Sequence, residues 1–359
     1  LAMGCGCCSC CCHKAAQAKE AYELVTADFD RGCKPERLGC AGAAVSSNAS
    51  CVPDVGAYEP PLAQKPSLPE APLLQDLVRL GHLGHGFTSL VELYEDRSTG
   101  NTYAMKVVSK GHVMKFKKHL SVMREKSILR MVDSPFIVKL LTTFDSPEHL
   151  YFLMEALLGG QLRQTYYDQK MYGSAEHTRY YTAGAVLALE HLHRHNIAYR
   201  DLKPENMVLD ARGNVKLTDM GAAKVVTDKT FTREGTPDYL APEVIAKVGH
   251  GRPVDWWTLG ILLFELMSGK PPFTAEKPAL IYEKVAAGIE TVLFPLACQG
   301  AVGELINSLL QRSPDDRLPS RPQGLQMLKA HAWYADFDWS AMAATQLRPP
   351  YVPIVRSNR

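Results

Sequence analysis

The sequence predicts an α+β fold of two lobes: a small lobe of antiparallel strands with one main helix, then a larger and mostly helical lobe. Strand-type residues fill much of 77–108, a helical apolar pattern covers 117–132, and the patterns after Gly159 and Gly160 are helical. The 359 residues are 46% hydrophobic, which is enough for two lobes with their own cores plus terminal segments. We therefore expect a ligand-binding cleft between the lobes.

The expected elements follow in a simple order, without an internal repeat. The strand-like runs are 91–94, 103–108, 137–144 and 150–154, and a polar turn at 96–101 joins the first two. The helical patterns are 117–132, 175–195, 253–269, 276–288, 302–311 and 322–330.

Composition excludes some classes of function and indicates a compartment. The formal net charge is +2, so charge alone indicates neither nucleic acid nor an acidic substrate as a partner. No apolar run of about 18 residues is present, so we expect no spanning helix. Most of the ten cysteines lie near the N-terminus, six of them between Cys5 and Cys12, and only Cys298 falls in the large domain. A folded region with one cysteine is not a disulfide scaffold, so we expect a reducing, cytoplasmic compartment.

Residues 1–13 predict lipid attachment. If Met3 is the true start, Gly4 begins a myristoylation-like signal, and Cys5 and Cys7 are candidate palmitoylation sites. One myristoyl chain holds a membrane marginally and a second acyl chain makes anchoring stable, so we expect peripheral binding to the inner leaflet. A metal-binding tract with His13 and a disordered tail are the alternatives. Two residues precede Met3, so a fragment of a longer chain is also open, and a start upstream of Met3 would exclude myristoylation.

Residues 14–72 predict a connecting segment. The part 14–29 is rich in Ala, Glu and Lys with apolar residues late, and predicts a short helix. The part 31–72 is rich in Gly, Ser, Ala and Pro without apolar periodicity, and predicts a flexible linker. Folded character begins near Leu73.

A glycine-rich stretch and a lysine in the first strands indicate phosphate binding. Residues 84–91 match the pattern G-x-G-x-x-G-x-V, except that Ser89 stands at the third glycine. Gly84 and Gly86 let backbone N–H groups approach phosphate without an intervening Cβ. Lys106 would pair with the α- and β-phosphates, and Glu125 of the next helix would hold it. Taken singly, these motifs also fit a structural turn, a surface lysine and a solvated glutamate.

The stretch 199–206, Tyr-Arg-Asp-Leu-Lys-Pro-Glu-Asn, carries the decisive signal. Phosphoryl transfer needs metal ions, a phosphate cradle and a positioned nucleophile. Asp201 would accept the proton of the substrate hydroxyl, Lys203 would neutralise the γ-phosphate, and Asn206 would ligate a metal ion. Asp219, further along, would bridge the magnesium ions, because hard cations prefer carboxylate oxygens. A loop of chance charges is a poor alternative, because every position of the stretch agrees.

These stretches resemble the catalytic loop and the metal-binding loop of eukaryotic protein kinases, and the resemblance covers about residues 75–340. Residues 235–243, Gly-Thr-Pro-Asp-Tyr-Leu-Ala-Pro-Glu, resemble the end of the kinase activation segment. The segments that resemble the AGC group are 199–201, 256–260, 271–273, 331–334 and 350–353. The segments that look most like cGMP-dependent protein kinase, with the cAMP-dependent catalytic subunit next, are 154–162, 180–183 and 288–290.

The resemblance implies a bilobal kinase fold that uses ATP and two Mg²⁺ ions to phosphorylate serine and threonine in basic peptides. The catalytic residues that it implies are Asp201, Lys203, Lys106 and Glu125, with Asn206 and Asp219 as metal ligands. The ATP-binding residues that it implies are Leu83, Gly84, Gly86, Val91, Ala104, Lys106, Met154, Glu155, Leu157 and Val208. Among these, the Glu155 and Leu157 backbones would contact adenine, and Met154 would be the gatekeeper.

The resemblance also implies regulatory, substrate-binding and structural residues. Thr232 would be the activation phosphosite, with Arg200 and Lys224 binding its phosphate. Glu205 and Glu265 would recognise substrate arginines. The structural residues that it implies are Asp255, which would brace the catalytic loop, and Glu243 and Arg317, which would form a buried pair.

Five positions depart from the family pattern, and one of them, Glu234 in place of a cysteine, has no obvious catalytic cost. Ser89 is expected to stiffen the glycine-rich loop and weaken its hold on phosphate, and Met220, which replaces a phenylalanine, is bulky enough for activity to survive. Ser121 replaces a histidine that joins the helix to the phosphosite in the cAMP-dependent enzyme, which puts that coupling in doubt. Gln161 replaces an acidic residue, so selection for an arginine three residues before the target should weaken. Ser89 and Met220 also motivate the alternative of a pseudokinase or ATP-binding scaffold without transfer.

The predicted organisation is an acylation segment at 1–13, a connecting segment at 14–72, a kinase domain at 73–334 and a partial AGC tail at 335–359. Within the kinase domain, the N-lobe is expected at 73–155 and the C-lobe at 158–334. Residues 1–72 are too few for a cyclic-nucleotide-binding domain beside the acyl segment. Control is therefore expected from a separate cyclic-nucleotide-binding regulatory subunit, an upstream kinase acting on Thr232, or a region outside this chain. The other expected partners are protein substrates with basic flanks and the inner leaflet of a membrane, but not nucleic acid.

Overall fold

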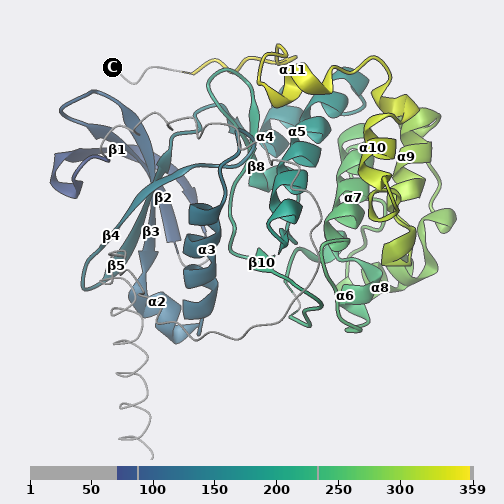
Figure 1. The fold of residues 1–359 in the computed structure, drawn as a ribbon, viewed down its shortest axis with the longest axis horizontal. Helices are drawn as coiled ribbons and strands as arrows, with labels where there is room; N and C mark the ends of the chain where they lie inside the picture. The colour runs from purple at the N-terminus through teal and green to yellow at the C-terminus, as the bar shows by residue number, and fades with distance from the viewer. Residues whose placement is uncertain (1–70, 87–88, 233, 356–359) are drawn as a thin grey trace, which may run out of the picture. The chain divides into compact units, whose positions relative to one another are not determined.

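The computed structural model describes residues 71–86, 89–232 and 234–355, and a compact unit begins at Leu73 (Figure 1). The acylation candidates Gly4, Cys5 and Cys7, the expected helix at 14–29 and nearly all of the expected linker lie outside the described residues. Among the residues that are described, no helix combines the length and the apolar character needed to cross a membrane.

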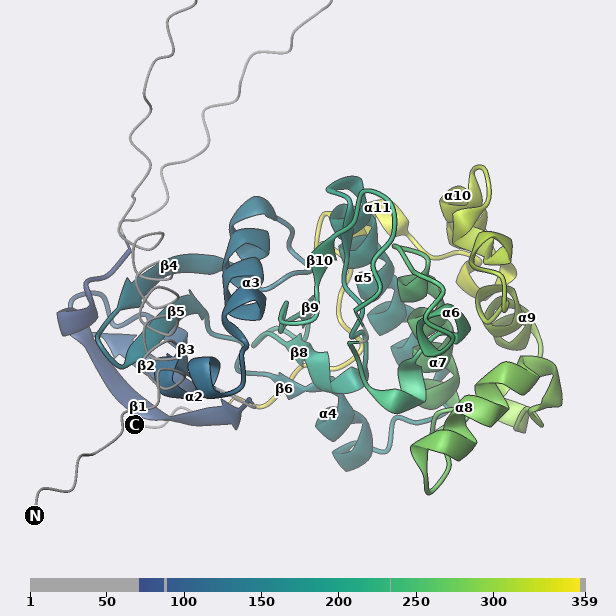
Figure 2. The ribbon, with the colours of Figure 1, turned by 90° about the horizontal axis from the view of Figure 1, so that it is seen from below.

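The N-lobe is a five-stranded antiparallel sheet in the order β1-β2-β3-β5-β4. Its strands are β1 (Leu77–His85), β2 (Ser89–Asp96), β3 (Thr102–Ser109), β4 (Leu140–Asp145) and β5 (His149–Glu155). The central strand β3 leads into the short helix α2 (Lys110–Lys115) and then α3 (His119–Met131). Helix α3 lies beside the sheet on the side of the C-lobe (Figure 2). The expected arrangement of strands with one main helix is confirmed.

The register of β3 places one lysine at the edge of the future site. Lys106 pairs with Val91 of β2 and with Phe152 of β5, while its neighbour Met105 is fully buried. Because side chains alternate along a strand, Lys106 points to the opposite face from Met105. That face looks toward the cleft between the lobes.

The C-lobe is built around helices α5 (Ala175–Arg194) and α7 (Val254–Ser268), which pack on each other. Nearly every residue of α7 is buried, so its sequence is apolar around the whole helix rather than on one stripe. The other helices of this lobe are α4 (Leu162–Asp168), α6 (Pro242–Ile245), α8 (Pro278–Ala287), α9 (Ala301–Leu309), α10 (Gly324–Lys329) and α11 (Trp339–Ala343).

Five very short strands carry the loops of the cleft. One small sheet joins β6 (Gly160–Gln161), β8 (Met207–Leu209) and β9 (Val215–Leu217), and another joins β7 (Ile197–Ala198) and β10 (Lys224–Val225). These strands lie where the N-lobe meets the C-lobe (Figure 2). The loops that follow β7 and β9 are therefore held at the cleft.

One expected strand is shorter than its pattern suggested. The run 137–144 is in the N-lobe sheet only from Leu140, because the residues before it pair across to the C-lobe. Val138 donates its backbone N–H to the Leu217 carbonyl at 2.9 Å, and Leu217 donates to the Phe136 carbonyl at 2.8 Å. The first residues of the apolar run therefore pair with the C-lobe, and those from Leu140 belong to the N-lobe sheet. Helices α2, α4, α6 and α11 were not expected from the sequence.

The segment after residue 334 returns across the C-lobe (Figure 1). The Trp339 indole donates to the Lys329 carbonyl at 2.9 Å, and α11 packs on α5. Gly213 has φ +93°, and a Cβ there would meet the carbonyl of Tyr351. Only glycine therefore lets the tail lie this close to the turn between β8 and β9.

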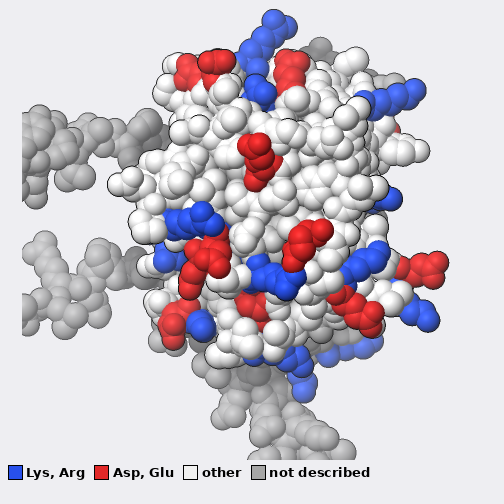
Figure 3. Space-filling model, turned by 90° about the vertical axis from the view of Figure 1, so that its right-hand side faces the viewer, with Lys and Arg blue, Asp and Glu red and all other residues white. Residues whose placement is uncertain are grey.

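Charged side chains are mixed on the face of the C-lobe seen in Figure 3. Lysine and arginine lie between aspartate and glutamate, and neither sign gathers into a broad area on this face. The mixture agrees with the formal net charge of +2. This face does not carry the basic stripe that a nucleic-acid surface requires.

Candidate active site

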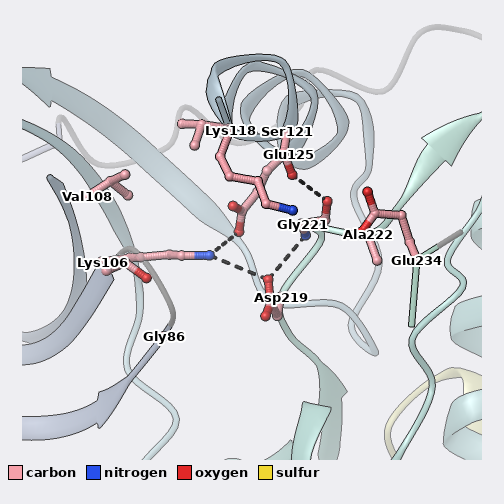
Figure 4. A pocket seen from close by; sticks show the side chains of 12 residues that line it. Gly86, Lys106, Val108, Lys118, Ser121, Glu125, Asp219, Gly221, Ala222 and Glu234 are labelled. Atoms are coloured by element: carbon pink, nitrogen blue, oxygen red, sulfur yellow. Dashed lines mark hydrogen bonds and ion pairs between the residues drawn. The ribbon is translucent and has the colours of Figure 1, made fainter. Parts of the chain in front are cut away.

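Lys106 lies at the centre of a buried charge cluster formed by three segments (Figure 4). Its Nζ is 2.5 Å from Oε1 of Glu125 on α3 and 3.5 Å from Oδ1 of Asp219 in the loop after β9. Glu125 is buried, while about half of the Asp219 side chain is exposed. The carboxylate that faces the cleft is therefore that of Asp219.

The pKa shifts favour the charged forms of Lys106 and Asp219, whereas burial raises the pKa of Glu125. Burial alone would lower the pKa of Lys106, but the carboxylates of Glu125 and Asp219 outweigh burial and raise that pKa above its ordinary value. The Lys106 charge in turn lowers the pKa of Asp219, although burial opposes it and the Gly221 N–H assists it. An ammonium and an ionised carboxylate thus face the same space.

The loop that carries Asp219 is held in an uncommon backbone conformation. Asp219 has φ +50°, and its Oδ1 accepts the Gly221 N–H at 3.1 Å. The Ser121 hydroxyl on α3 donates to the Gly221 carbonyl at 2.8 Å (Figure 4). Met220 between them is fully buried. Ser121 therefore joins α3 to the loop that carries Asp219, at the position where a coupling of α3 to the phosphosite was in doubt.

A second network surrounds Asp201 in the loop after β7. Lys203 Nζ donates to Asp201 Oδ2 at 2.9 Å, and Asn206 Nδ2 donates to the same oxygen at 2.8 Å. Thr236 Oγ1 receives a hydrogen bond from Lys203 at 2.8 Å and donates to Asp201 Oδ1 at 3.2 Å. Because the Asn206 amide nitrogen is used by Asp201, its amide oxygen is the group that suits a cation.

Asp255 at the start of α7 fixes the backbone of this loop. Its Oδ2 accepts the Tyr199 N–H at 2.9 Å and its Oδ1 accepts the Arg200 N–H at 2.7 Å. The His193 ring nitrogen Nε2 lies 2.7 Å from Oδ2. Arg200 has φ +69°, a conformation that costs free energy for a residue with a Cβ. The Asp255 carboxylate holds that conformation.

A cavity of about 350 Å³ lies between the lobes beside both networks. Every residue that the sequence analysis assigned to ATP binding lines it, together with Glu125, Asn206 and Asp219. Further lining residues that the sequence analysis did not assign include Leu129, Val138 and Thr218. The lining combines apolar side chains at Val91, Ala104, Met154, Leu157 and Val208 with charged side chains that include Lys106, Glu125 and Asp219. This combination suits a flat base together with Mg²⁺-bound phosphates.

The activation segment places Thr232 against Arg200. Arg200 Nη1 donates to Thr232 Oγ1 at 2.9 Å, while Nε, on another edge of the guanidinium, donates to the Ala222 carbonyl. Lys224 Nζ donates instead to Thr230 Oγ1 at 2.8 Å, and the two threonine hydroxyls lie 3.2 Å apart. Both expected cations are therefore grouped at Thr232, but only Arg200 contacts it directly.

The two carboxylates expected to bind substrate arginines both have partners inside the chain. Arg163 Nη1 donates to Glu205 Oε1 in an ion pair at the surface. Glu265 is only 3% exposed, and the Tyr239 hydroxyl donates to its Oε2. Burial, with Glu205 nearby, raises the pKa of Glu265 despite the hydrogen bond from Tyr239.

Glu243 and Arg317 form the expected pair deep in the C-lobe. The guanidinium binds the carboxylate through two parallel bonds of 2.8 and 2.7 Å, and both side chains are buried. Arg317 also donates to the carbonyls of Pro253 and Gln311 and lies over the Trp257 ring. The pair therefore joins the end of the activation segment to the base of α7.

Sequence reasoning assigned no role to three residues of this region, Thr236, Tyr239 and Arg163. Thr236 and Tyr239 lie within the quoted stretch 235–243, so their presence in that motif was a usable signal. Arg163 lies on α4, a helix that was not expected, and it belongs to none of the sequence motifs described above. No signal in the sequence pointed to its pairing with Glu205, 42 residues away.

Known proteins with the same pattern were found by comparison. The protein kinase domain family matches residues 77–334. The cAMP-dependent protein kinase catalytic subunit PRKX of Homo sapiens is 40% identical over 320 residues, which are 88% of each chain. The cAMP-dependent protein kinase catalytic subunit of Dictyostelium discoideum is 40% identical over 283 residues, 79% of this chain and 43% of that one. Isozyme 2 of Drosophila melanogaster cGMP-dependent protein kinase, forms cD5/T2, is 39% identical over 286 residues, 79% of this chain and 30% of that one.

The two-lobed fold, its cleft and the family match place the chain in the protein kinase family, to which it belongs. Within that family it is a serine/threonine kinase of the AGC group, and ATP with Mg²⁺ is the cofactor pair of the family. The predicted bilobal fold and the predicted AGC membership are thus confirmed. The cAMP- and cGMP-dependent branches match at nearly equal identity.

Proposed function

We propose that the chain transfers the γ-phosphoryl group of ATP to serine and threonine hydroxyls of proteins, with Asp201 accepting the proton of the attacking hydroxyl. The carrying observation is the convergence of Lys106, Asp219, Asn206, Asp201 and Lys203 beside one cavity. Asp201 Oδ2 accepts hydrogen bonds from Lys203 and Asn206, which would orient this carboxylate toward the attacking hydroxyl. Lys203 is hydrogen-bonded to Asp201 and Thr236, and its ammonium would stabilise negative charge on the phosphoryl group during transfer.

Nucleotide binding would use both the apolar and the charged lining of the cavity. Lys106 would bind the α- and β-phosphates, and the backbones of Glu155 and Leu157 would bind adenine. Two Mg²⁺ ions, held by Asp219 and Asn206, would neutralise phosphate charge when bound. The residues fit this role because the Asp219 carboxylate lies 3.5 Å from the lysine that would bind phosphate, and Asn206 lines the same cavity.

Activation would follow phosphorylation of Thr232. A phosphate there would meet Arg200 at once and Lys224 after a small shift from Thr230. Such charge-assisted bonds order a loop, and Arg200 is next to Asp201 in the chain. The phosphate would therefore stabilise the loop that carries the proposed base.

Substrates are proposed to carry basic residues before the target, recognised by Glu205 and Glu265. Because Gln161 stands where the family pattern has an acidic residue, one carboxylate fewer would bind the substrate arginines. A separate cyclic-nucleotide-binding subunit is proposed because relatives named cAMP-dependent catalytic subunits align over most of the chain. Pull-down of partners with and without cAMP or cGMP tests this. If neither nucleotide changes how much partner is retained or how strongly the partner inhibits the kinase, the proposal is rejected.

Membrane association is proposed through acyl chains on Gly4, Cys5 and Cys7. The intact mass of the protein purified from its natural source tests it, because myristate and palmitate each add a fixed mass. The same spectrum reports whether the chain carries phosphate. A mass equal to the unmodified chain would reject the acylation proposal and leave the kinase proposal standing.

Transfer of radiolabelled phosphate from ATP to a basic serine peptide tests the catalytic proposal. The protein is first phosphorylated on Thr232, and wild type is compared with Asp201→Asn. We expect transfer by wild type and at least a hundredfold loss in the variant, because the base is removed while Lys203 and Asn206 keep a partner at position 201. Equal rates in the two proteins would overturn the proposal.

A further inference from the structure

Arg163 binds one of the two carboxylates that the proposed function assigns to substrate arginines. It lies on α4, which packs against the short helix Pro204–Asn206 that carries Glu205. Its Nη1 donates to Glu205 Oε1, and Glu205 lines the nucleotide cavity together with Gln161. An arginine of the chain therefore makes the contact that the proposed function gives to an arginine of the substrate.

We infer that Arg163 is a specificity-determining residue that competes with substrate arginine for Glu205, so that the kinase accepts neutral residues before its target nearly as well as arginine. The inference rests on the proposed transfer to protein substrates and refines its preference for basic flanks. It follows from a contact within the chain and from the types of residue around it.

Glu265 is much less accessible than Glu205 to a substrate guanidinium. Its side chain is buried beneath the Tyr239 hydroxyl, which donates to it. A substrate arginine would have to displace Tyr239 or reach a carboxylate with 3% exposure. Glu205 is thus the accessible acceptor, and Arg163 already binds it.

The charge count of this subsite points the same way. Arg163 balances Glu205, and Gln161 is neutral, so the remaining negative charge comes from buried Glu265 and from Asp238 near it. Attraction of a cationic peptide depends on the net charge that the surface presents. Substrate arginine therefore gains little from long-range attraction here.

The size of the effect is limited by exposure. The Arg163 side chain is 56% exposed and that of Glu205 33% exposed, so the ion pair is a surface pair. Such pairs are weak and screened by salt, and a substrate can displace Arg163 at low cost. We expect attenuated selection for arginine rather than exclusion of it.

The test measures the preference for arginine directly. Three serine peptides are compared that differ only in carrying arginine two residues before the target, arginine three residues before it, or alanine at both positions. We expect nearly equal kcat/KM for all three with wild type. Arg163→Gln should raise the arginine-to-alanine ratio about two- to fivefold, mainly through KM, the range that a surface ion pair allows.

Matched variants separate charge from general damage. Arg194→Gln removes another exposed arginine that pairs with a glutamate, Glu190 on α5, and should leave the ratio unchanged. Arg163→Lys keeps the charge and should stay near wild type. Arg163→Gln combined with Glu205→Gln should lose the gain, and the gain should shrink in about 0.5 M salt.

Each result is decisive. An unchanged ratio in Arg163→Gln, with all peptides still phosphorylated, overturns the role of Arg163 and leaves the proposed function intact. Absence of transfer to every peptide by wild type overturns the proposed function instead. In that case, fluorescence anisotropy of the same labelled peptides, bound with a non-hydrolysable ATP analogue, still shows whether Arg163→Gln tightens the arginine peptides selectively.

Discussion

The backbone N–H of Arg200 donates to Oδ1 of Asp255 at 2.7 Å, and Arg200 has φ +69°. The two residues are 55 positions apart, and both are buried. The N–H of Tyr199 donates to the other carboxylate oxygen, so one side chain fixes two successive peptide groups. The strained turn that presents Asp201 thus depends on a carboxylate supplied by α7.

Asp255→Asn should lower kcat strongly while the protein stays folded. An asparagine can accept only one of the two N–H groups, and its amide nitrogen faces the other as a second donor. The loss of one hydrogen bond to a charged acceptor costs about 1.5–3 kcal/mol, which corresponds to about 10–100-fold in rate if the turn relaxes. Steady-state kinetics on a serine peptide measure it, with KM for ATP expected to change less.

Glu283→Gln on α8 is the matched control, because it removes a carboxylate from an exposed helical position. Its kcat and its melting temperature should equal those of wild type. If Asp255→Asn kept the wild-type kcat, the proposed dependence of Asp201 on Asp255 would be wrong.

Glu125→Gln should weaken catalysis by disturbing Lys106. The neutral amide no longer balances the buried ammonium, so Lys106 should move toward Asp219, which now lies 3.5 Å away. The lysine would then pair with the Asp219 carboxylate rather than bind the phosphates of ATP. We expect kcat/KM for ATP to fall about 10–100-fold, as is typical when a charged partner at an active site is lost.

Glu148→Gln, at an exposed position of the same lobe, should leave kcat/KM for ATP unaltered. A second readout follows the lysine itself: a nucleotide-like acyl phosphate probe should label Lys106 more slowly in Glu125→Gln. Equal labelling and equal kcat/KM in both variants would remove Glu125 from the proposed site.

The central residues of the site were predictable from the sequence because they lie in short local patterns. Their order also indicates the two lobes, since the glycine-rich loop and Lys106 lie among the strand-like runs, whereas 199–206 and Asp219 follow the helical pattern 175–195. The strands of the N-lobe were visible as β-type runs separated by a polar turn. Local spacing was therefore enough to place the main charged groups in one cleft.

Contacts between distant segments were not predictable in the same way. Ser121 and Gly221 are 100 positions apart, and a serine in a helix gives no sign that its hydroxyl will meet a loop carbonyl. Helix α4 is only seven residues long, too short for a clear apolar period, so Arg163 could not be placed. Pairings of this kind are set by packing and need the structure.

Glu243→Gln should destabilise the whole domain. It leaves the Arg317 guanidinium, which is fully buried, without its compensating charge. Removing one partner of a buried pair costs about 3–5 kcal/mol, because the remaining charge stays in a poorly solvating interior. Chemical unfolding with urea should show this loss as a lower midpoint at an unchanged slope.

A double replacement distinguishes this cause from simple loss of contacts. Glu243→Leu combined with Arg317→Met removes both charges and should be less destabilising than either single change, because no charge is left buried alone. Additive losses in the double variant would mean that the pair contributes through packing, and the electrostatic account would then fail.

His250 should make the stability of the unphosphorylated protein depend on pH. Its side chain is buried, and its Nε2 lies 3.5 Å from Arg200 Nη1. Burial, then Arg200 and Lys224, lower the pKa of His250 below its ordinary 6.5, although Glu243 and Asp255 oppose them. The unfolded chain therefore binds a proton more readily than the folded one, so stability falls as pH drops below about 6.5.

Melting temperatures at pH 7.5, 6.5 and 5.5 should fall less steeply in His250→Gln than in wild type. Phosphate on Thr232 would partly cancel the Arg200 charge, so the phosphorylated wild type should also be less sensitive to acid. Parallel curves for wild type and His250→Gln would show that other groups cause the acid sensitivity.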